Sequence, residues 1–366
     1  MGFASALDKE EKEPSKKDKI PFRKNRKLQL IIVGSVIVAL LVVIGIIAWF
    51  NYRAKNAGIT TGKSGLVVCK LDGMKYAKNK ANRHPLAVSI ENHPDSRPQS
   101  GFTDAAIVYE AITEGGITRY LAIFGPKDVN EIGPIRSARL FFMDWLKEYD
   151  AFFAHAGGNE DALNQMEAYG VKDLNHTDPY FWRDSKGRSV ASEHTLYSST
   201  EQLYKFAADK GFDVNSSKFT PFKFKTDGPA MTSGGKGVSI DFSGQPSYKV
   251  RWDYDIAGNS YKRFLADEPH KDRNNDKQIE AKNIIIQTVS RTLQPQGSFG
   301  SQNWVFDTVG EGKAKVLRDG QVIEGTWKKK SRDDRTMFYD SSGKEIQFNP
   351  GQTWYEVIPP EVEPQI

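Results

Sequence analysis

Residues 107–124 read IVYEAITEGGITRYLAIF, and this stretch sets the architecture of the first half of the chain. Two runs rich in β-branched and aromatic residues, 107–111 and 117–124, flank Glu114-Gly115-Gly116. Runs of this composition favour strands, and paired glycines favour a reversal of the chain between them. The stretch therefore predicts an antiparallel hairpin.

Strands are also expected on both sides of this hairpin. In residues 86–91 apolar side chains alternate with small or polar ones, which predicts a strand that runs into Asn92-His93-Pro94. Residues 151–154 read AFFA and predict a short buried strand that leads through His155 into a glycine-rich turn. Turns at strand ends gather at the mouth of an α/β sheet, so we expect polar residues there to lie close together.

Helices are expected between these strands. After Gly133-Pro134 the apolar residues recur at helical spacing, with Ser137 as the expected N-cap. Asn159 is the expected cap of a second helix, and Ser199 with Gln202 forms the capping box of a third. The alternation of strands and helices predicts a layered α/β arrangement.

The second half of the chain changes to a β pattern. A glycine-rich run at 233–237 indicates a linker, and Asp319-Gly320 indicates a tight hairpin between two later apolar runs. We therefore expect an α+β protein, with a mixed α/β first domain that contains a mixed sheet and a smaller, mostly antiparallel β domain. The expected segments are a tail at 1–29, a membrane anchor at 30–50, a stalk at 51–67, the first domain at 68–228, a linker at 229–237 and the second domain at 238–360.

One transmembrane helix is expected before these domains. Residues 30–50 hold no charged side chain, and at about 1.5 Å per residue they match a hydrocarbon core of about 30 Å. A cleaved signal peptide has a shorter apolar stretch, of about 7–15 residues, and small residues at its cleavage site. Neither that alternative nor a buried soluble helix fits the run as well as an uncleaved anchor.

The net charge of +5 is concentrated before this anchor. Residues 1–29 carry nine basic and five acidic side chains, so the remainder of the chain is nearly neutral. An excess of Lys and Arg marks the cytoplasmic end of a span, which predicts a cytoplasmic N-terminus and domains on the outer face of the cell membrane. A nucleic-acid-binding protein needs a basic face on its folded domain, and we do not expect that function here.

Cys69 is the single cysteine of the chain. It excludes an internal disulfide, and a bacterial exterior suits such a protein better than a disulfide-rich secretory pathway. The run Leu66-Val67-Val68-Cys69 resembles a lipidation signal, but it lies well beyond the apolar stretch and has Val where a small residue is expected. We interpret Cys69 as an ordinary apolar cysteine.

Two arginines at an expected helix start suggest an anion site. Arg136 and Arg139 flank Ser137, where helix dipoles already present positive charge. A carboxylate or phosphate held by the helix N-terminus, Ser137 and the guanidinium groups offsets that charge. In the alternative, both arginines simply pair with Glu110, Glu114 or Asp144. The candidate ligand-binding residues are Arg97, Arg119, Arg136, Ser137, Arg139, Asn159 and Arg183.

Acid and base groups in the same region suggest a second chemistry. Glu110 or Glu114 is a candidate general acid or base, with His155 or His194 assisting. The polar stretch from Arg183 to His194 is long enough to cover a sheet mouth, although a solvated surface loop is the alternative. The six histidines lack the spacing of a helix-borne zinc site, so neither a metal nor another cofactor is expected.

The first half of the chain contains the motifs HPLAV at 84–88, NHP at 92–94, RPQSG at 97–101, IVYE at 107–110, EGGITR at 114–119, IGPIRSAR at 132–139 and HAGG at 155–158. Together these motifs resemble those of the YerB-like family of bacterial envelope lipoproteins, also called DUF3048. The family's second domain is similar to Gly325-Thr326-Trp327-Lys328 and to the run from Asn349 to Trp354. The resemblance implies a two-domain extracytoplasmic protein, whose biochemical activity is unassigned. The chain departs from the family at its N-terminus, where an apolar helix stands in place of a lipidated cysteine.

Three functions remain open from the sequence. The first is a membrane-tethered binding protein whose α/β domain recognises an anionic small molecule or a wall-derived ligand. The second is an envelope hydrolase or transferase that uses the Glu, His and Arg groups named above. The third is a structural partner in an envelope complex, with an exposed apolar patch on the β-rich domain. The sequence does not identify protein partners.

Overall fold

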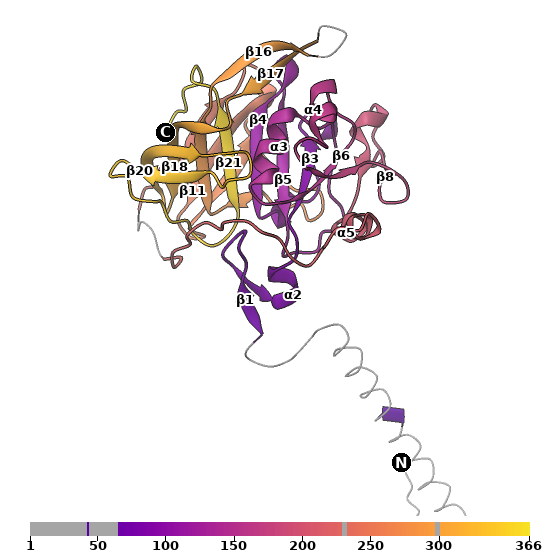
Figure 1. Ribbon diagram of the computed structural model, residues 1–366. Helices are drawn as coiled ribbons and strands as arrows, with labels where there is room; N and C mark the ends of the chain where they lie inside the picture. The colour runs from indigo at the N-terminus through magenta and orange to yellow at the C-terminus, as the bar shows by residue number, and fades with distance from the viewer. Residues whose placement is uncertain (1–41, 44–64, 229–232, 297–300) are drawn as a thin grey trace, which may run out of the picture. The chain divides into compact units, whose positions relative to one another are not determined.

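A mixed ten-stranded sheet is the centre of the structure, a computed structural model that describes residues 42–43, 65–228, 233–296 and 301–366. The strand order in this described part is β20-β19-β18-β15-β21-β4-β5-β3-β6-β7 (Figure 1). Strands from both halves of the chain therefore pair in one sheet. Their bounds are β3 Leu86–Glu91, β4 Ile107–Ile112, β5 Thr118–Phe124, β6 Phe152–His155, β7 Lys172–Asn175, β15 Asn283–Thr288, β18 Gly310–Arg318, β19 Gln321–Lys329, β20 Met337–Asp340 and β21 Thr353–Ile358.

The last strand, β21, joins the two halves. It runs parallel to β4 on one side and to β15 on the other, so that Tyr355 lies opposite both Tyr109 and Ile285. The described residues from 65 onward accordingly form one compact unit. The domain boundaries drawn from the sequence remain a prediction, and the structure adds that the two predicted domains share the central sheet.

The hairpin predicted at 107–124 is confirmed. β4 and β5 pair antiparallel, and the reversal is a short 3-10 turn, η3, over Glu114–Gly116. Gly115 and Gly116 have φ of 65° and 76°, which residues with a Cβ rarely adopt. β3 lies antiparallel to the other edge of β5, and β6 and β7 follow parallel to β3.

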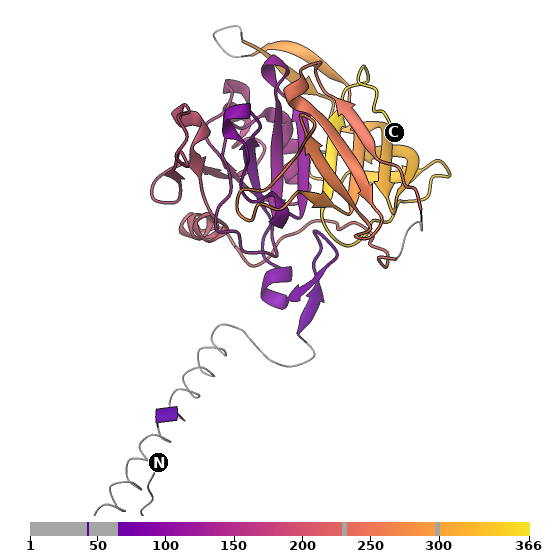
Figure 2. The same cartoon turned by 180° about the vertical axis from the view of Figure 1, so that it is seen from behind.

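A second sheet of five strands packs on one face of the first (Figure 2). Trp252 of this sheet contacts Trp354 of β21, with ring centroids 5.3 Å apart, and both side chains are fully buried. The expected antiparallel character of the second half is confirmed here, because every pairing within this sheet is antiparallel. Its strands are β10 Val238–Asp241, β11 Lys249–Asp255, β12 Ser260–Leu265, β13 Glu268–Pro269 and β14 Glu280–Ala281.

The other face of the central sheet is covered by α3, Leu140–Lys147. Its apolar side chains after Leu140 are buried, and Trp145 stacks on Tyr109 of β4 at 5.0 Å. The prediction of Ser137 as the N-cap is wrong, because this helix begins three residues later. Residues 135–138 are extended instead, since the amides of Arg136 and Ala138 donate to the carbonyls of Ser89 and Gly157.

Ser199 is confirmed as the N-cap, the first half of the predicted capping box. Its hydroxyl accepts a hydrogen bond of 3.1 Å from the amide of Gln202 at the start of α5, Thr200–Asp209. The remaining elements are β1 Leu66–Val68, β2 Lys75–Ala77, α2 Lys78–Ala81, α4 Glu160–Gln165, β8 Trp182–Arg183, β9 Leu196–Tyr197, β16 Arg291–Gln296, β17 Ser301–Phe306 and the 3-10 turns η1 Pro94–Ser96, η2 Phe102–Asp104, η4 Ser192–His194 and η5 Pro246–Tyr248.

The expected membrane span at 30–50 lies outside the described residues except for Val42 and Val43, which are helical. Among the residues that the structure describes, no helix combines the length and the apolar character needed to cross a bilayer. Cys69 follows β1 and is buried, and this burial raises the pKa of its thiol to about 12. It therefore lies in the folded unit as an apolar cysteine.

A fully buried arginine links the two sheets. Arg263 of β12 forms ion pairs with Glu110 of β4 and with Glu356 of β21, the latter at 3.3 Å, and its Nε donates to His270 Nδ1 at 3.0 Å. Trp252 Nε1 donates to the same Glu356 oxygen at 2.6 Å. The guanidinium group thus compensates two carboxyl groups that no water reaches.

We predict that Arg263→Ala destabilises the fold by about 3–5 kcal/mol, because it leaves buried carboxyl groups without a counter-charge. The measurement is urea-induced unfolding of the full-length chain in detergent, followed by tryptophan fluorescence. Arg251→Ala is the matched control on the neighbouring strand. Arg251 is partly exposed and pairs with Asp253, so its loss is expected to cost only about 1 kcal/mol. Equal effects of the two substitutions contradict the proposed role of Arg263.

Candidate functional site

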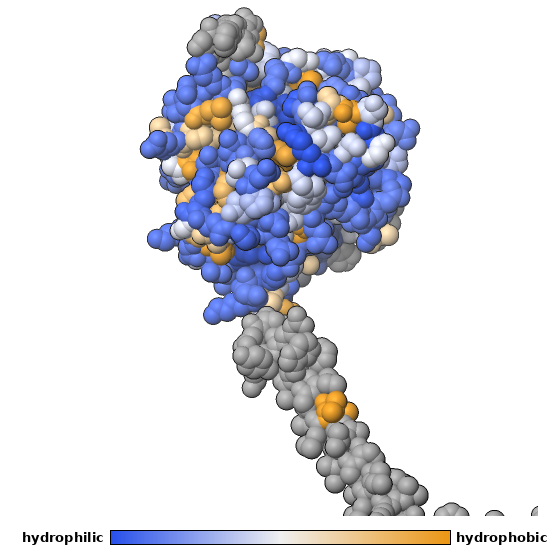
Figure 3. Space-filling model, turned by 90° about the vertical axis from the view of Figure 1, so that its right-hand side faces the viewer, coloured by the Kyte–Doolittle hydropathy of each residue, from blue (hydrophilic) through white to orange (hydrophobic). Residues whose placement is uncertain are grey.

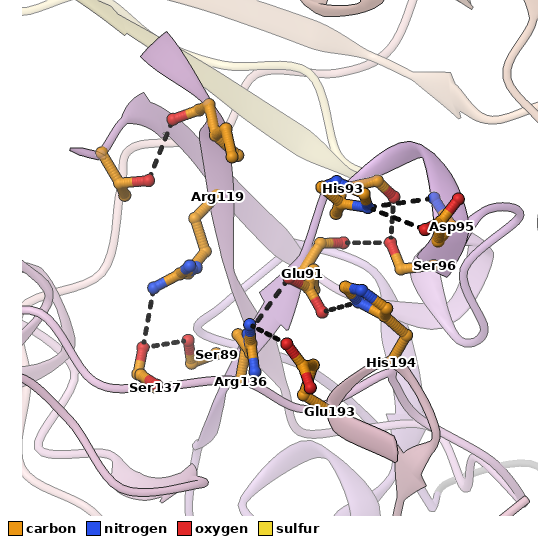
Figure 4. Close-up of polar contacts among 12 residues, drawn as sticks. Ser89, Glu91, His93, Asp95, Ser96, Arg119, Arg136, Ser137, Glu193 and His194 are labelled. Atoms are coloured by element: carbon orange, nitrogen blue, oxygen red, sulfur yellow. Dashed lines mark hydrogen bonds and ion pairs between the residues drawn. The ribbon is translucent and has the colours of Figure 1, made fainter. Parts of the chain in front are cut away.

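The last residue of β3, Glu91, is the centre of a polar cluster (Figure 4). It is 3% exposed, and its Oε2 lies 2.8 Å from Nδ1 of His194. Its other oxygen lies 3.1 Å from Nε of Arg136, whose Nη2 is 3.7 Å from Glu193. Since a carboxylate only accepts hydrogen bonds, Nδ1 of His194 is the donor, and in the neutral imidazole Nε2 keeps its lone pair.

A second histidine lies against the first. The ring of His93 stacks on the ring of His194, with centroids 4.8 Å apart. His93 begins the turn η1, and its Nδ1 accepts a 3.2 Å hydrogen bond from the amide of Asp95. His, Cys, Asp and Glu side chains can bind metal ions. In the described part of the chain, one group of three or more of them has its ligand atoms all within 4.8 Å of one another, and it consists of His93, Asp95 and His194.

Two arginines share one carboxylate beside this cluster. Glu114 forms a two-pronged ion pair with Arg139, in which Nε lies 2.9 Å from Oε2. Arg119 reaches the same carboxylate only at 3.5 Å. Burial alone raises the pKa of Glu114, but the two guanidinium groups outweigh it and lower this pKa to about 2. The pairing of Arg139 with Glu114 is the alternative that the sequence left open.

Arg119 itself is poorly paired. It is 4% exposed, and its Nη1 donates to the carbonyl of Ser137 at the long distance of 3.5 Å. Its Nε has no hydrogen-bond partner. Burial, and then the nearby charge of Arg139, lower the pKa of Arg119 to about 9. The site therefore contains a buried cation whose donors are not fully used.

The other predicted ligand-binding residues lie in different surroundings. Arg97 donates to the side-chain and backbone oxygens of Asn92, at 3.1 and 2.8 Å. Asn159 precedes α4, and the exposed Arg183 of β8 donates to the carbonyl of Ser192. Three of the seven residues predicted to bind a ligand are thus joined in the structure: Arg119 contacts Ser137 and shares the partner Glu114 with Arg139. Arg136 precedes Ser137 in the sequence.

The four candidate catalytic residues lie in four separate groups of contacts. Glu110 is fully buried, where Thr118 Oγ1 donates to it at 2.6 Å and Arg263 pairs with it. His155 Nε2 lies 2.8 Å from Asp173. Glu114 pairs with arginines and His194 with Glu91, so that within the described residues none of the four bonds to another. Their assignment as an acid–base group remains a prediction.

Sequence reasoning missed Glu91, His93, Asp95 and Glu193 as site residues. The run Asn92-His93-Pro94 marks a strand end in the sequence, and this was the one signal available. Nothing in the spacing predicts that His194, from a distant segment, packs against it. The contact depends on the position of η4 beside the end of β3.

Comparison with known proteins identifies the class to which this fold and this cluster belong. Residues 71–213 match the N-terminal domain, and residues 238–355 the C-terminal domain, of a family described as proteins of unknown function, DUF3048. The chain belongs to this family.

One relative comes from Bacillus subtilis (strain 168) and is named "Putative lipoprotein YerB". It is 31% identical over 293 residues, which cover 79% of this chain and 85% of the relative. The crystal structure of the YerB protein from Bacillus subtilis is similar in fold, with a TM-score of 0.71 and 29% identity. The similarity covers 82% of this chain and all of the crystallised chain.

The buried carboxyl groups around Glu110 predict a pH-dependent stability. Burial, and then the charge of Glu110, raise the pKa of Glu356 to about 8. The folded protein therefore keeps a proton that the unfolded chain releases above its ordinary pKa of 4.5. The free energy of unfolding should fall as pH rises from about 5 to about 8, by at most about 1.4 kcal/mol per pH unit.

Urea-induced unfolding of the full-length chain across this pH range checks the prediction. Glu356→Gln removes the titrating group, so this component of the slope should disappear. Glu361→Gln, at an exposed carboxylate, is the control and should retain it. A Glu356→Gln variant with the unchanged slope contradicts the assignment.

Proposed function

We propose that this protein is anchored in the bacterial cell membrane by residues 30–50, with its folded part on the outer face, and that it binds an anionic ligand at Arg119, Arg136, Ser137 and Arg139. The uncharged run and the basic segment before it support the anchor. The name of the relative from Bacillus subtilis describes a lipoprotein, and a lipid and an apolar helix tether a protein to the same surface.

The observation that carries the binding proposal is the incomplete pairing of Arg119. Five donors of a guanidinium group are available, yet the two contacts to Glu114 and Ser137 are both 3.5 Å long and Nε is without a partner. A buried polar group left in this state is unfavourable by about 1–3 kcal/mol. An added carboxylate or phosphate offers the missing acceptors in the geometry that arginine prefers.

The position of Glu114 is where such a ligand would reach the buried arginines. Its side chain is 42% exposed, whereas those of Arg119 and Arg139 are 5% and 9% exposed. The carboxylate occupies the turn between β4 and β5, beside two glycines with positive φ. We interpret Glu114 as a resident anion that a ligand carboxylate or phosphate replaces, while Arg136 and Ser137 line the more open side. A wall-derived ligand with such a group fits this chemistry.

Substitutions on the two sides of this ion pair should change affinity in opposite directions. Arg136→Ala combined with Arg139→Ala removes two cations and should weaken anion binding at least about tenfold. Glu114→Gln removes the resident negative charge and should strengthen it. Calorimetric titration of the full-length chain in detergent with inorganic phosphate, acetate and a muramyl peptide measures both effects.

Arg251→Ala is the control for a general loss of positive charge, because this arginine lies on β11 and pairs with Asp253. It should leave affinity unchanged. Unaltered binding in the double arginine variant rules out this site, and weaker binding in Glu114→Gln rules out the replacement of Glu114 by the ligand.

The proposal of an outer-face anchor is tested by thiol labelling in intact cells. Native Cys69 is buried and its raised pKa keeps the thiol protonated near neutral pH, so the unmodified protein should not react with a membrane-impermeant maleimide. Ser342→Cys, at an exposed turn of the folded unit, should be labelled. Ser15→Cys, in the basic tail, should be labelled only after the membrane is permeabilised. Labelling of Ser15→Cys in intact cells contradicts the orientation.

The two alternative functions have weaker support. For a hydrolase or transferase, the favourable observation is the histidine held by a carboxylate, His194 with Glu91. For a structural partner, a groove of about 1270 Å³ runs along β18, β19 and the C-terminal segment, but Lys315, Glu324 and Lys328 line it with charge. On the face drawn in Figure 3, hydrophobic residues lie in small groups among hydrophilic ones. An extended apolar patch would be needed for that role.

A further inference from the structure

His93, Asp95 and His194 bring three metal-binding side chains together at the end of β3. One ligand atom from each lies within 4.8 Å of the others. We propose that these three residues bind a divalent transition-metal ion, with zinc as the best match to two imidazoles and one carboxylate. Two nitrogen ligands disfavour calcium and magnesium, which prefer oxygen.

Glu91 orients the buried ligand. His194 is held through Nδ1 by Glu91 at 2.8 Å, so that in the neutral imidazole Nε2 is the atom with the lone pair for a metal ion. Carboxylate partners of this kind fix the tautomer and the ring orientation of metal-binding histidines. Arg136, at 3.1 Å from the other Glu91 oxygen, in turn holds the carboxylate. The His194 ligand is therefore in place before an ion arrives.

One guanidinium group ties together the two segments that carry the ligands. Arg188 donates to the backbone carbonyl of Asp95 and, at 3.4 Å, to that of His194. The hydroxyl of Ser96 closes the turn η1 by donating to the carbonyl of His93 at 2.6 Å. These contacts hold the backbone of both segments that carry the ligands.

The other two ligands must move to complete the site. The rings of His93 and His194 are nearly parallel, at 13°, so their in-plane lone pairs do not meet at one point. Tetrahedral zinc places its ligand atoms roughly 3.4 Å apart. The ligand atoms of the three residues now lie up to 4.8 Å from one another. The side chains of His93 and Asp95 are 37% and 57% exposed, whereas that of His194 is 8% exposed, so the first two have more room to turn. Binding should therefore break the ring stack by turning His93.

The Glu91–Arg136 ion pair connects the proposed metal site to the proposed anion site, but His93 and Asp95 belong to the metal site alone. With three protein ligands, zinc keeps an open coordination position for water or a ligand oxygen. His93 and Asp95 make no contact with Arg119 or Arg139 among the described residues. Substitution of His93 or Asp95 should therefore leave the anion site intact.

Metal binding is tested on the full-length chain in detergent after treatment with a chelator. Zinc is titrated against a chromogenic competitor, and cobalt is added to report the coordination geometry by its visible spectrum. His93→Ala and Asp95→Asn, at exposed side chains, should each weaken zinc binding at least about tenfold without loss of the fold. Glu91→Gln should weaken it about 10–100-fold by releasing His194. His176→Ala, at an exposed histidine away from the cluster, is the matched control and should bind zinc as the unmodified chain does.

Each outcome decides the proposal. Saturable binding of one zinc per chain that depends on His93 and Asp95, but not on His176, supports it. Absence of saturable binding at micromolar zinc, or equal affinity in His93→Ala and the unmodified chain, overturns it. Phosphate binding measured on His93→Ala separates this result from the anion proposal, because the arginines remain in place.

Discussion

The pairing of β21 with β4 and β15 is the constraint on which the rest of the structure depends. Residues near the end of the chain lie in the middle of the sheet, where Glu356 is opposite Glu110 on β4 and Ile286 on β15. A strand in this place cannot form until almost the whole chain is available. Such long-range pairing is slow to close, since loop entropy is lost before the contacts are gained. The two halves of the chain are thereby joined in one folded unit.

The same strand brings a charge into the protein interior. Glu356 and Glu110 are neighbours on parallel strands, and both are fully buried. Two buried carboxylates on neighbouring strands are unfavourable without compensation. This explains why Arg263 reaches both from the second sheet and why Glu356 holds a proton at higher pH than usual. Glu110 is therefore occupied by structural contacts. The polar cluster proposed as the functional site lies around Glu91, at the end of β3, which is separated from β4 by β5.

Around Glu91 several arginine and glutamate side chains share their ion-pair partners. Arg139 pairs with both oxygens of Glu114, so Arg119 reaches this carboxylate only at 3.5 Å. Arg136 pairs with both Glu91 and Glu193. Glu91 also orients His194. One carboxylate at a strand end thus connects a region with unused donors to a region with unused metal ligands. This arrangement is the physical basis of the two proposals, an anion site on one side of Glu91 and a metal site on the other.

The local elements were predictable, because they follow from the periods of strands and helices. The hairpin at 107–124, the strand at 86–91 and the Ser199 cap are present as expected, and the uncharged run at 30–50 rests on the sequence alone. The start of α3 was not predictable, since backbone bonds to Ser89 and Gly157 draw residues 135–138 into an extended path. The arginines were found by position, but their partners were not. Those partners come from segments far apart in the sequence, so only the tertiary structure, by fixing where each strand ends, decided that Glu91 meets His194 and that Glu110 meets Arg263.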